Sequence, residues 1–420
     1  MKKLSIFLTV AVCLLAFPFL VQADTPDLDF EGETVTYVDY WDPFGDVERR
    51  KEEAEALFNV NLEYMTVDDH VDTIVSRVLA GDATHDIVRV SKLQFWPLMA
   101  ENALYPVGDY LGNDFYEEQP GFLRTVNRDK FQFENQSYGF SVADSGIWNM
   151  KFLQYNVDLF ERYGLEDPFE LWQAGEWTWD VFREQMVALT DETQDQYGIT
   201  NLELDGLSLS NNAKIVDDED GKMVFAYDRE EGIETLEFYL DMEDLGVIGG
   251  TDEDFRAGNV GMQPGETWVF HKDNHEGMED ERNFVPWPAG PSADKPQIGM
   301  GNVATHMLPI TAEEPEALVE LHNWLFAEQI QDDELIMEWL VADYIESEED
   351  LKFFEWVMEE WSGEGYMVES LIGAFFAAGT DAEEPFARAI GYVIEGERSP
   401  EAALSAEKEA IQAILDDTFN

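Results

Sequence analysis

The first hundred residues alternate between short runs rich in β-branched or aromatic residues and longer amphipathic stretches. Extended patterns cover 34–38, 60–64 and 86–90. Apolar residues at helical spacing cover 46–58 and 68–79 between them. This β-α-β-α-β order predicts an α/β fold with a parallel sheet and right-handed crossovers.

Parallel sheets of this kind bind ligands at the carboxyl ends of their strands. Tyr40, Trp41 and Asp42 follow the first predicted strand, and Ser91 and Gln94 follow the third. We therefore take these five residues as candidate ligand contacts. The alternative is that the aromatic pair only packs its own loop.

Helical patterns dominate the second half of the chain, and the predicted helices are 157–163, 179–189, 311–327 and one opened by Ser399-Pro400. Thr311 and Glu314 have the spacing of a capping box at the start of the third of these helices. The acidic run 217–221 resembles a calcium loop in composition only. It lacks alternating acids with glycine in sixth place, so we predict a hairpin turn there.

The N-terminus has the three parts of a secretory signal peptide. Lys2 and Lys3 precede an apolar stretch, and Val21-Gln22-Ala23 offers small residues at a cleavage site before Asp24. The alternative is a membrane anchor, which Pro18 and the cleavage site disfavour. The only cysteine, Cys13, lies inside the apolar stretch, so a lipid anchor and disulfides are not expected in the mature protein.

Acidic residues dominate the charge. The chain carries 25 Lys and Arg against 90 Asp and Glu, a formal net charge of −65. Nucleic acid and anionic lipid are excluded as expected partners, because both need a basic face. Disorder is also disfavoured, since 45% hydrophobic and 13% aromatic residues can build large cores. Repulsion among so many acidic side chains destabilises the folded state unless salt screens it, which predicts a protein adapted to high salt.

Several short motifs recur in the order seen in one known family. They are residues 80–88 (AGDATHDIV), Tyr138-Gly139 followed by 155–160 (YNVDLF), 177–180 (WTWD), 255–262 (FRAGNVGM) leading to Trp268, and 286–291 (PWPAGP). Together they resemble the extracellular solute-binding proteins of the family that includes maltose-binding protein. The chain departs from the family pattern at Phe140-Ser141, where a proline is usual.

The resemblance implies a type II periplasmic-binding-protein-like fold, with two α/β lobes joined by crossing segments near 140–146, 280–290 and 327–333. The expected division is a signal peptide at 1–23, a first lobe from 24–143 and 285–330, and a second lobe from 144–284 and 331–420. A carbohydrate would bind between the lobes of a monomer and pass to the permease of an ABC importer. The protein would act in the periplasm or outside the cytoplasmic membrane, without a cofactor.

Sugars present flat C–H faces to aromatic rings and hydroxyl groups to carboxylates and amides. The resemblance adds six candidate contacts to those at the strand ends: Asp144, Trp148, Trp268, Trp287, Asn302 and Phe375, the last with Phe376 as its alternative. Among these, Trp268 follows the turn-forming residues 265–267 and is the strongest candidate for stacking on a sugar ring.

Other functions remain as alternatives. Pairs of acids can hydrolyse glycosides, but the sequence contains no nucleophile elbow, His-Glu-x-x-His motif or phosphate-binding glycine loop. His271 and His275 have metal-ligand spacing, but their surroundings favour a surface loop without metal. The same binding fold could instead hold a polyamine, a metal complex or a peptide.

Overall fold

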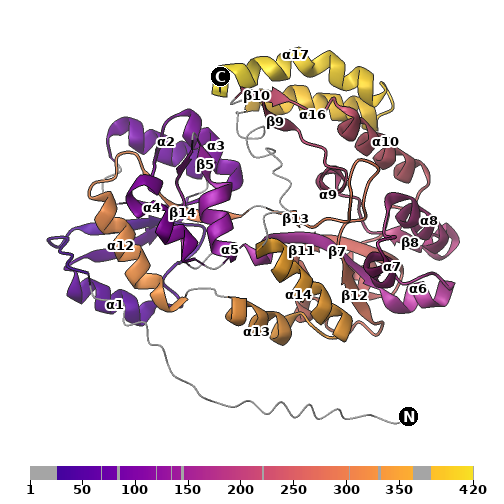
Figure 1. Cartoon of the computed structure of the whole chain (residues 1–420), viewed down its shortest axis with the longest axis horizontal. Helices are drawn as coiled ribbons and strands as arrows, with labels where there is room; N and C mark the ends of the chain where they lie inside the picture. Colours follow the sequence, from indigo (N-terminus) through magenta and orange to yellow (C-terminus); the bar gives the residue numbers. More distant parts are fainter. Residues whose placement is uncertain are drawn as a thin grey trace, which may run out of the picture.

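The computed structural model describes residues 26–419, except 68, 83–85, 120, 134, 143–145, 220–221, 302, 330–332 and 363–379. Figure 1 shows two bodies side by side, each with its own sheet and covering helices. The chain crosses between these two lobes more than once, so neither lobe is a continuous segment.

The first lobe contains a five-stranded sheet of order β2-β1-β3-β14-β4. Strands β1 (Thr34–Val38), β2 (Asn61–Met65) and β3 (Asp86–Ser91) are parallel, whereas β14 (Ala304–Pro309) runs antiparallel to β3 and to β4 (Leu104–Tyr105). The helices of this lobe are α1 (Glu48–Leu57), α2 (His70–Ala80), α3 (Lys92–Ala100), α4 (Gly108–Glu117) and α12 (Pro315–Phe326). The predicted β-α-β-α-β order is therefore present.

Local signals explain where these helices begin and end. The Asp69 carboxylate accepts a hydrogen bond from the Asp72 N–H at the start of α2, and Gly81 ends the helix at φ 66°, a conformation that favours glycine. The capping box predicted at Thr311 is wrong. Helix α12 begins at Pro315, which suits a first turn because it lacks an N–H, and Glu314 before it is left-handed.

A short segment leads from the first lobe to the second. It contains α5 (Gly121–Arg124), a π-helical turn at Thr125–Lys130, and the hairpin β5 (Gln132–Phe133) and β6 (Gln136–Ser137). The first crossing follows, because the Ser141 N–H still bonds to Thr305 of the first sheet at 3.2 Å, whereas the Ile147 carbonyl accepts from Thr267 of the second lobe.

The second lobe has a sheet of order β12-β7-β11-β8, with β13 also paired to β7. Its strands are β7 (Met150–Asn156), β8 (Tyr197–Ile199), β11 (Val260–Glu266), β12 (Arg282–Val285) and β13 (Gly299–Met300). The helices around it are α6 (Val157–Tyr163), α7 (Pro168–Ala174), α8 (Trp179–Leu189), α9 (Leu204–Ser210), α10 (Glu230–Asp244), α11 (Asp252–Arg256), α13 (Asp333–Asp343) and α14 (Glu348–Ser362).

A smaller core forms at one end of the second lobe. The hairpin of β9 (Val216–Glu219) and β10 (Lys222–Phe225) packs with α10 and with the C-terminal helices α16 (Thr380–Ile394) and α17 (Pro400–Phe419). Figure 1 shows α16 and α17 stacked at the top of this lobe. The hairpin predicted around the acidic run 217–221 is therefore confirmed.

The second crossing lies later than expected. Residues 286–300 were assigned to the first lobe, but Trp287 pairs with Gln297, Ala289 pairs with Thr178, and β13 pairs with β7, all in the second lobe. The proline-rich stretch thus belongs to the second lobe, and the chain changes lobes between Met300 and Ala304. It returns after α12, between Ala327 and Asp333.

Candidate functional site

Two aromatic residues stand at the carboxyl end of β1. The side chains of Tyr40 and Trp41 are 37% and 56% exposed. The Tyr40 ring stacks on His70 with centroids 4.5 Å apart, and its hydroxyl donates to Gln94 Oε1 at 2.6 Å. As predicted, the ends of β1 and β3 bring Tyr40, Trp41 and Gln94 together.

Arg89 completes this part of the site. Its guanidinium lies 4.2 Å from the centroid of the Trp41 ring, and one of its nitrogens is 3.6 Å from the buried Asp39 carboxylate. Burial alone would raise the pKa of Asp39, but the hydrogen bond and charge of His306, together with Arg89, lower it below its ordinary value. Asp39 is therefore ionised under the aromatic pair, where it anchors the arginine.

Ser91 and Asp42 have local roles. Ser91 is 3% exposed and forms a capping box with Gln94 at the start of α3, so its hydroxyl serves the helix and not an open surface. The exposed Asp42 carboxylate accepts from the Phe44 N–H at 2.9 Å. Ser91 therefore positions Gln94, and Asp42 shapes the loop that carries Trp41.

The second lobe contributes Trp268, which follows β11 on a 3-10 turn, Thr267–Phe270. Its indole is 56% exposed, and its Nε1–H donates to Glu266 Oε2 at 2.7 Å. Asn149 donates to the same oxygen at 3.2 Å. Trp268 is thus an exposed ring whose polar edge is already bound, which leaves its faces for an apolar contact.

A short segment of the second crossing connects the two groups. The Gly301 N–H bonds to the Asn149 carbonyl at 2.6 Å, and the Val303 carbonyl accepts from the Lys92 N–H at 2.8 Å. Three residues of chain span at most about 11 Å. Lys92 directly follows β3, and Asn149 contacts Glu266, so this crossing joins the end of β3 to the turn beside Glu266.

Further charged residues lie beside Glu266 in the second lobe. Lys151 on β7 donates to Asp205 at 2.6 Å and to Glu203 at 3.3 Å. Burial, then the charge of Asp205, raises the pKa of Glu203, although Lys151 opposes the shift. This cluster supplies hydrogen-bond acceptors near Trp268.

Two tryptophans predicted to contact ligand have other surroundings. Trp287 is 0% exposed, and its ring lies so close to Gly206 that a Cβ there would overlap it. The prediction for Trp287 is therefore wrong, because its segment stays inside the second lobe. Trp148 is half-buried and packs against Trp339 and Tyr344, with ring centroids 5.8 and 5.7 Å away.

Three further candidates, Asp144, Asn302 and Phe375, lie outside the described residues. The sequence interpretation missed Arg89, His70 and Glu266. Arg89 had a usable signal, since it interrupts the apolar run of the strand IVRV, and strands of a parallel sheet are usually apolar throughout.

His271 and His275, the pair with metal-ligand spacing, differ in burial. His275 is 8% exposed, and its Nε2 is 2.8 Å from Gln154 Nε2. Burial and the nearby Arg282 lower the pKa of His275 to about 4. Within the described residues, no group of three metal-ligating side chains comes together.

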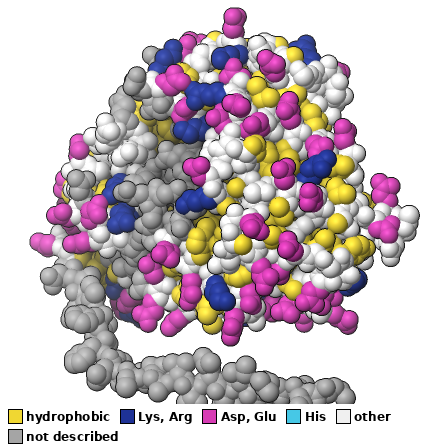
Figure 2. All heavy atoms as spheres, turned by 45° about the vertical axis from the view of Figure 1, so that its right-hand side comes forward, with side chains coloured by type: hydrophobic (Ala, Val, Ile, Leu, Met, Phe, Trp, Pro, Cys, Tyr) yellow, Lys and Arg dark blue, Asp and Glu magenta, His cyan; other side chains and the backbone are white. Residues whose placement is uncertain are grey.

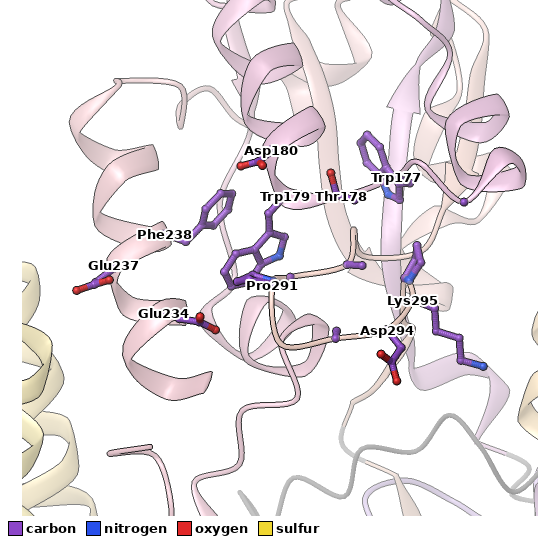
Figure 3. A pocket seen from close by; sticks show the side chains of 15 residues that line it. Trp177, Thr178, Trp179, Asp180, Glu234, Glu237, Phe238, Pro291, Asp294 and Lys295 are labelled. Atoms are coloured by element: carbon purple, nitrogen blue, oxygen red, sulfur yellow. The ribbon is translucent and has the colours of Figure 1, made fainter. Parts of the chain in front are cut away.

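A separate pocket of about 500 Å³ lies wholly within the second lobe. Trp179 and Phe238 stack at 4.3 Å on one side, and Asp180, Glu234 and Asp294 surround them (Figure 3). Its lining comes from the start of α8, from α10 and from residues 289–296. Because no first-lobe residue lines it, this pocket is distinct from the aromatic groups at the crossing.

Acidic side chains are spread over the whole face shown in Figure 2, among fewer lysines and arginines. Among the helices of the described part of the chain, none combines the length and the apolar character needed to cross a membrane.

The two-lobe fold agrees with the family to which the sequence can be matched. The family model of bacterial extracellular solute-binding proteins matches residues 48–332, and the chain belongs to that family. No curated protein sequence matches significantly. The fold is the type II two-lobe periplasmic-binding-protein fold, as predicted.

Solved structures with this fold are distant in sequence. An ABC substrate-binding protein, Lmo0181 from Listeria monocytogenes, in complex with cycloalternan, is 16% identical with a TM-score of 0.64, covering 91% of this chain and 99% of that one. A cyclic alpha-maltosyl-1,6-maltose binding protein from Arthrobacter globiformis is 16% identical with a TM-score of 0.62, covering 91% of this chain and 99% of that one. A solute-binding protein from Agrobacterium radiobacter K84, in complex with ribitol, is 18% identical with a TM-score of 0.59, covering 92% of this chain and 99% of that one.

Proposed function

We propose that this protein binds a neutral carbohydrate between its lobes and delivers it to the membrane permease of an ABC importer. The observation that carries the proposal is that each lobe has an exposed indole, Trp41 or Trp268, directly after a strand of its sheet. Carboxylates and amides accompany both rings, which is the combination that sugar faces and hydroxyl groups require.

The local charge favours a neutral ligand over an anionic one. Glu266, Glu203 and Asp205 surround Lys151 in the second lobe, and Asp39 offsets Arg89 in the first. An acidic sugar would meet like charges at short range. The ligands of the similar structures, cycloalternan and ribitol, support the same class of solute.

Export and lobe division belong to the same proposal. Residues 1–23 would be removed as a signal peptide; this segment lies outside the described residues. The sheet pairings support a first lobe that contains β1 to β4 and β14, and a second lobe that contains β7 to β13. We expect the protein to act as a monomer. Mass spectrometry of secreted protein should find an N-terminus at or near Asp24. An intact Met1 on the mature protein would contradict export by cleavage.

A thermal-shift panel in high salt tests the binding function. The panel contains ribitol, glucose, maltose, maltotetraose, a cyclodextrin, galacturonic acid, spermidine and a mixed peptide library. A ligand at 100 times its Kd adds about 2.7 kcal/mol of stability. We expect a neutral sugar or polyol to stabilise the protein without product release. Stabilisation by spermidine or peptide alone would overturn the carbohydrate proposal, and product release would indicate a hydrolase.

A further inference from the structure

Glu266 is the last residue of β11, and its carboxylate is surrounded by groups from three segments. The Trp268 indole and the Asn149 amide both donate to Oε2, at 2.7 and 3.2 Å. The third neighbour is Gly301, where a Cβ would overlap Glu266 Oε1. Glu266 itself is only half-exposed.

Each of these neighbours belongs to a different functional part. Trp268 is the exposed ring of the second lobe. Asn149 ends the turn Ile147–Asn149 that follows the first crossing, and Gly301 lies in the second crossing. The Gly301 N–H also bonds to the Asn149 carbonyl at 2.6 Å. The Glu266 carboxylate therefore lies where the two crossing segments contact each other.

A carboxylate is a suitable anchor for an indole. The charge-assisted hydrogen bond to Nε1–H is roughly twice as strong as a neutral one, and it fixes the plane of a ring that is otherwise exposed. The absence of a side chain at Gly301 lets the crossing approach the carboxylate. If either crossing segment moves, the Glu266 side chain should therefore move with it and change the orientation of the Trp268 ring.

We propose that Glu266 is a positioning residue that holds the Trp268 ring in its binding orientation and couples that orientation to the two crossing segments. The ligand-dependent part rests on the proposed carbohydrate binding. The anchoring itself is a property of the free protein, so it can be tested without any ligand.

Indole N–H resonances provide the ligand-free test. Protein labelled with ¹⁵N-tryptophan has 12 indole signals to resolve, and the one lost in Trp268→Phe belongs to Trp268. In Glu266→Ala this signal should shift upfield and exchange faster with water, whereas Glu266→Gln should restore part of the shift. Glu184→Ala, an exposed acid on α8, is the matched control and should leave it unchanged.

Gly301→Ala tests the coupling to the crossing. The added Cβ should displace the carboxylate and move the Trp268 signal in the same direction as Glu266→Ala, although both hydrogen-bonding partners remain. An unmoved Trp268 signal in Glu266→Ala overturns the anchoring, and an unmoved signal in Gly301→Ala overturns the coupling. Melting curves of all variants confirm that each one is folded.

A double-mutant cycle tests the effect on binding, with maltotetraose as the probe, or ribitol where maltotetraose does not bind. Glu266→Ala should weaken binding about tenfold, which corresponds to 1.4 kcal/mol. In a Trp268→Phe background, which has no N–H to anchor, the same change should have little further effect. Equal effects in both backgrounds would mean that Glu266 contacts the sugar directly, which overturns the positioning role. If no neutral sugar or polyol of the thermal-shift panel binds, the carbohydrate proposal fails, while the resonance test still decides the anchoring.

Discussion

Trp268 and Trp287 both belong to the second lobe, but they differ completely in exposure. Trp268 is 56% exposed and donates from its indole N–H to Glu266, whereas Trp287 is 0% exposed and lies against Gly206. The same substitution should therefore affect ligand affinity at one position and folding at the other.

Trp268→Ala should weaken carbohydrate binding about tenfold to a hundredfold, because a ring stacked on a sugar face contributes roughly 1.5–3 kcal/mol. The melting temperature should change little, since the ring is not part of a core. Calorimetric titration and a melting curve measure the two effects. Normal affinity in the variant would remove Trp268 from the binding site.

Trp287→Ala is the matched control for that experiment. Removal of a core tryptophan costs ~3–5 kcal/mol of folding stability. Folded Trp287→Ala protein, at a temperature below its lowered melting point, should still bind sugar with near-normal affinity. A large loss of affinity in folded protein would show that the segment 286–300 also shapes the binding site.

Some of these residues could be placed from the sequence and others could not. Tyr40 and Trp41 were located because the carboxyl ends of parallel strands meet at one edge of a sheet. Trp287 was misplaced, because the distance of a side chain from solvent depends on which lobe its backbone joins. That choice depends on long-range pairing with residues such as Thr178 and Lys151, which no local pattern encodes.

Helices and strands with strong local signals were predicted to within two residues of their observed bounds. The helix predicted at 68–79 is observed at His70–Ala80, and the strand predicted at 34–38 is observed at Thr34–Val38. The start of α12 was misread, since Pro315 overrides the spacing of Thr311 and Glu314. The hydrophobic periodicity was enough to locate these elements. It could not show that β14 returns to the first sheet, because that depends on pairing between strands far apart in the sequence.

The start of α14 carries a carboxyl group with a strongly shifted pKa. Asp350 is 1% exposed, and its Oδ2 accepts from the N–H groups of Glu346 and Ser347 at 2.8 and 3.0 Å. Burial raises the pKa of Asp350 from 3.8 to about 6, although these hydrogen bonds and Arg282 oppose the shift.

The raised pKa of Asp350 predicts how the free energy of unfolding changes with pH. Between about pH 4 and pH 6 the native state keeps the Asp350 proton that the unfolded chain has lost, so the stability contributed by this group falls as pH rises. Asp350→Asn removes that dependence. The stability of the variant minus that of the wild type should rise by about 3 kcal/mol across this window.

Urea unfolding at several pH values measures that difference, and the subtraction removes the background from the other acids. Glu348→Gln, which removes an exposed acid from the same first turn, is the control for the loss of a carboxylate at this end of the helix. A flat difference for Asp350→Asn would mean that the buried carboxyl titrates normally.

For the whole molecule, the charge of −65 should make stability depend steeply on salt. The screening length falls from about 30 Å at 0.01 M to about 3 Å at 1 M, so repulsion among surface carboxylates is progressively removed. We expect the melting temperature to rise strongly between dilute buffer and molar KCl. A level melting temperature would contradict adaptation to high salt and would leave the fold assignment intact.

The two-lobe arrangement predicts closure around the ligand. Small-angle scattering at saturating sugar should show a smaller radius of gyration at unchanged molecular mass. Trp268→Ala protein at the same sugar concentration provides the matched comparison, because its partial occupancy should give a smaller change. An identical scattering profile with and without bound sugar would rule out closure.

The position of β14 also has a consequence for how the chain matures. Strand β14 lies between β3 and β4 in the first sheet, although β3 ends at Ser91 and β14 begins at Ala304, after most of the second lobe. A ribosome therefore releases the strand that completes the first sheet only after the part of the second lobe that precedes Ala304 has been synthesised. Until then one edge of β3 stays open, and an open strand edge is a template for intermolecular pairing. A chain truncated before Ala304 should therefore be prone to intermolecular pairing through β3, and the first lobe cannot complete its sheet until the residues up to β14 have been made.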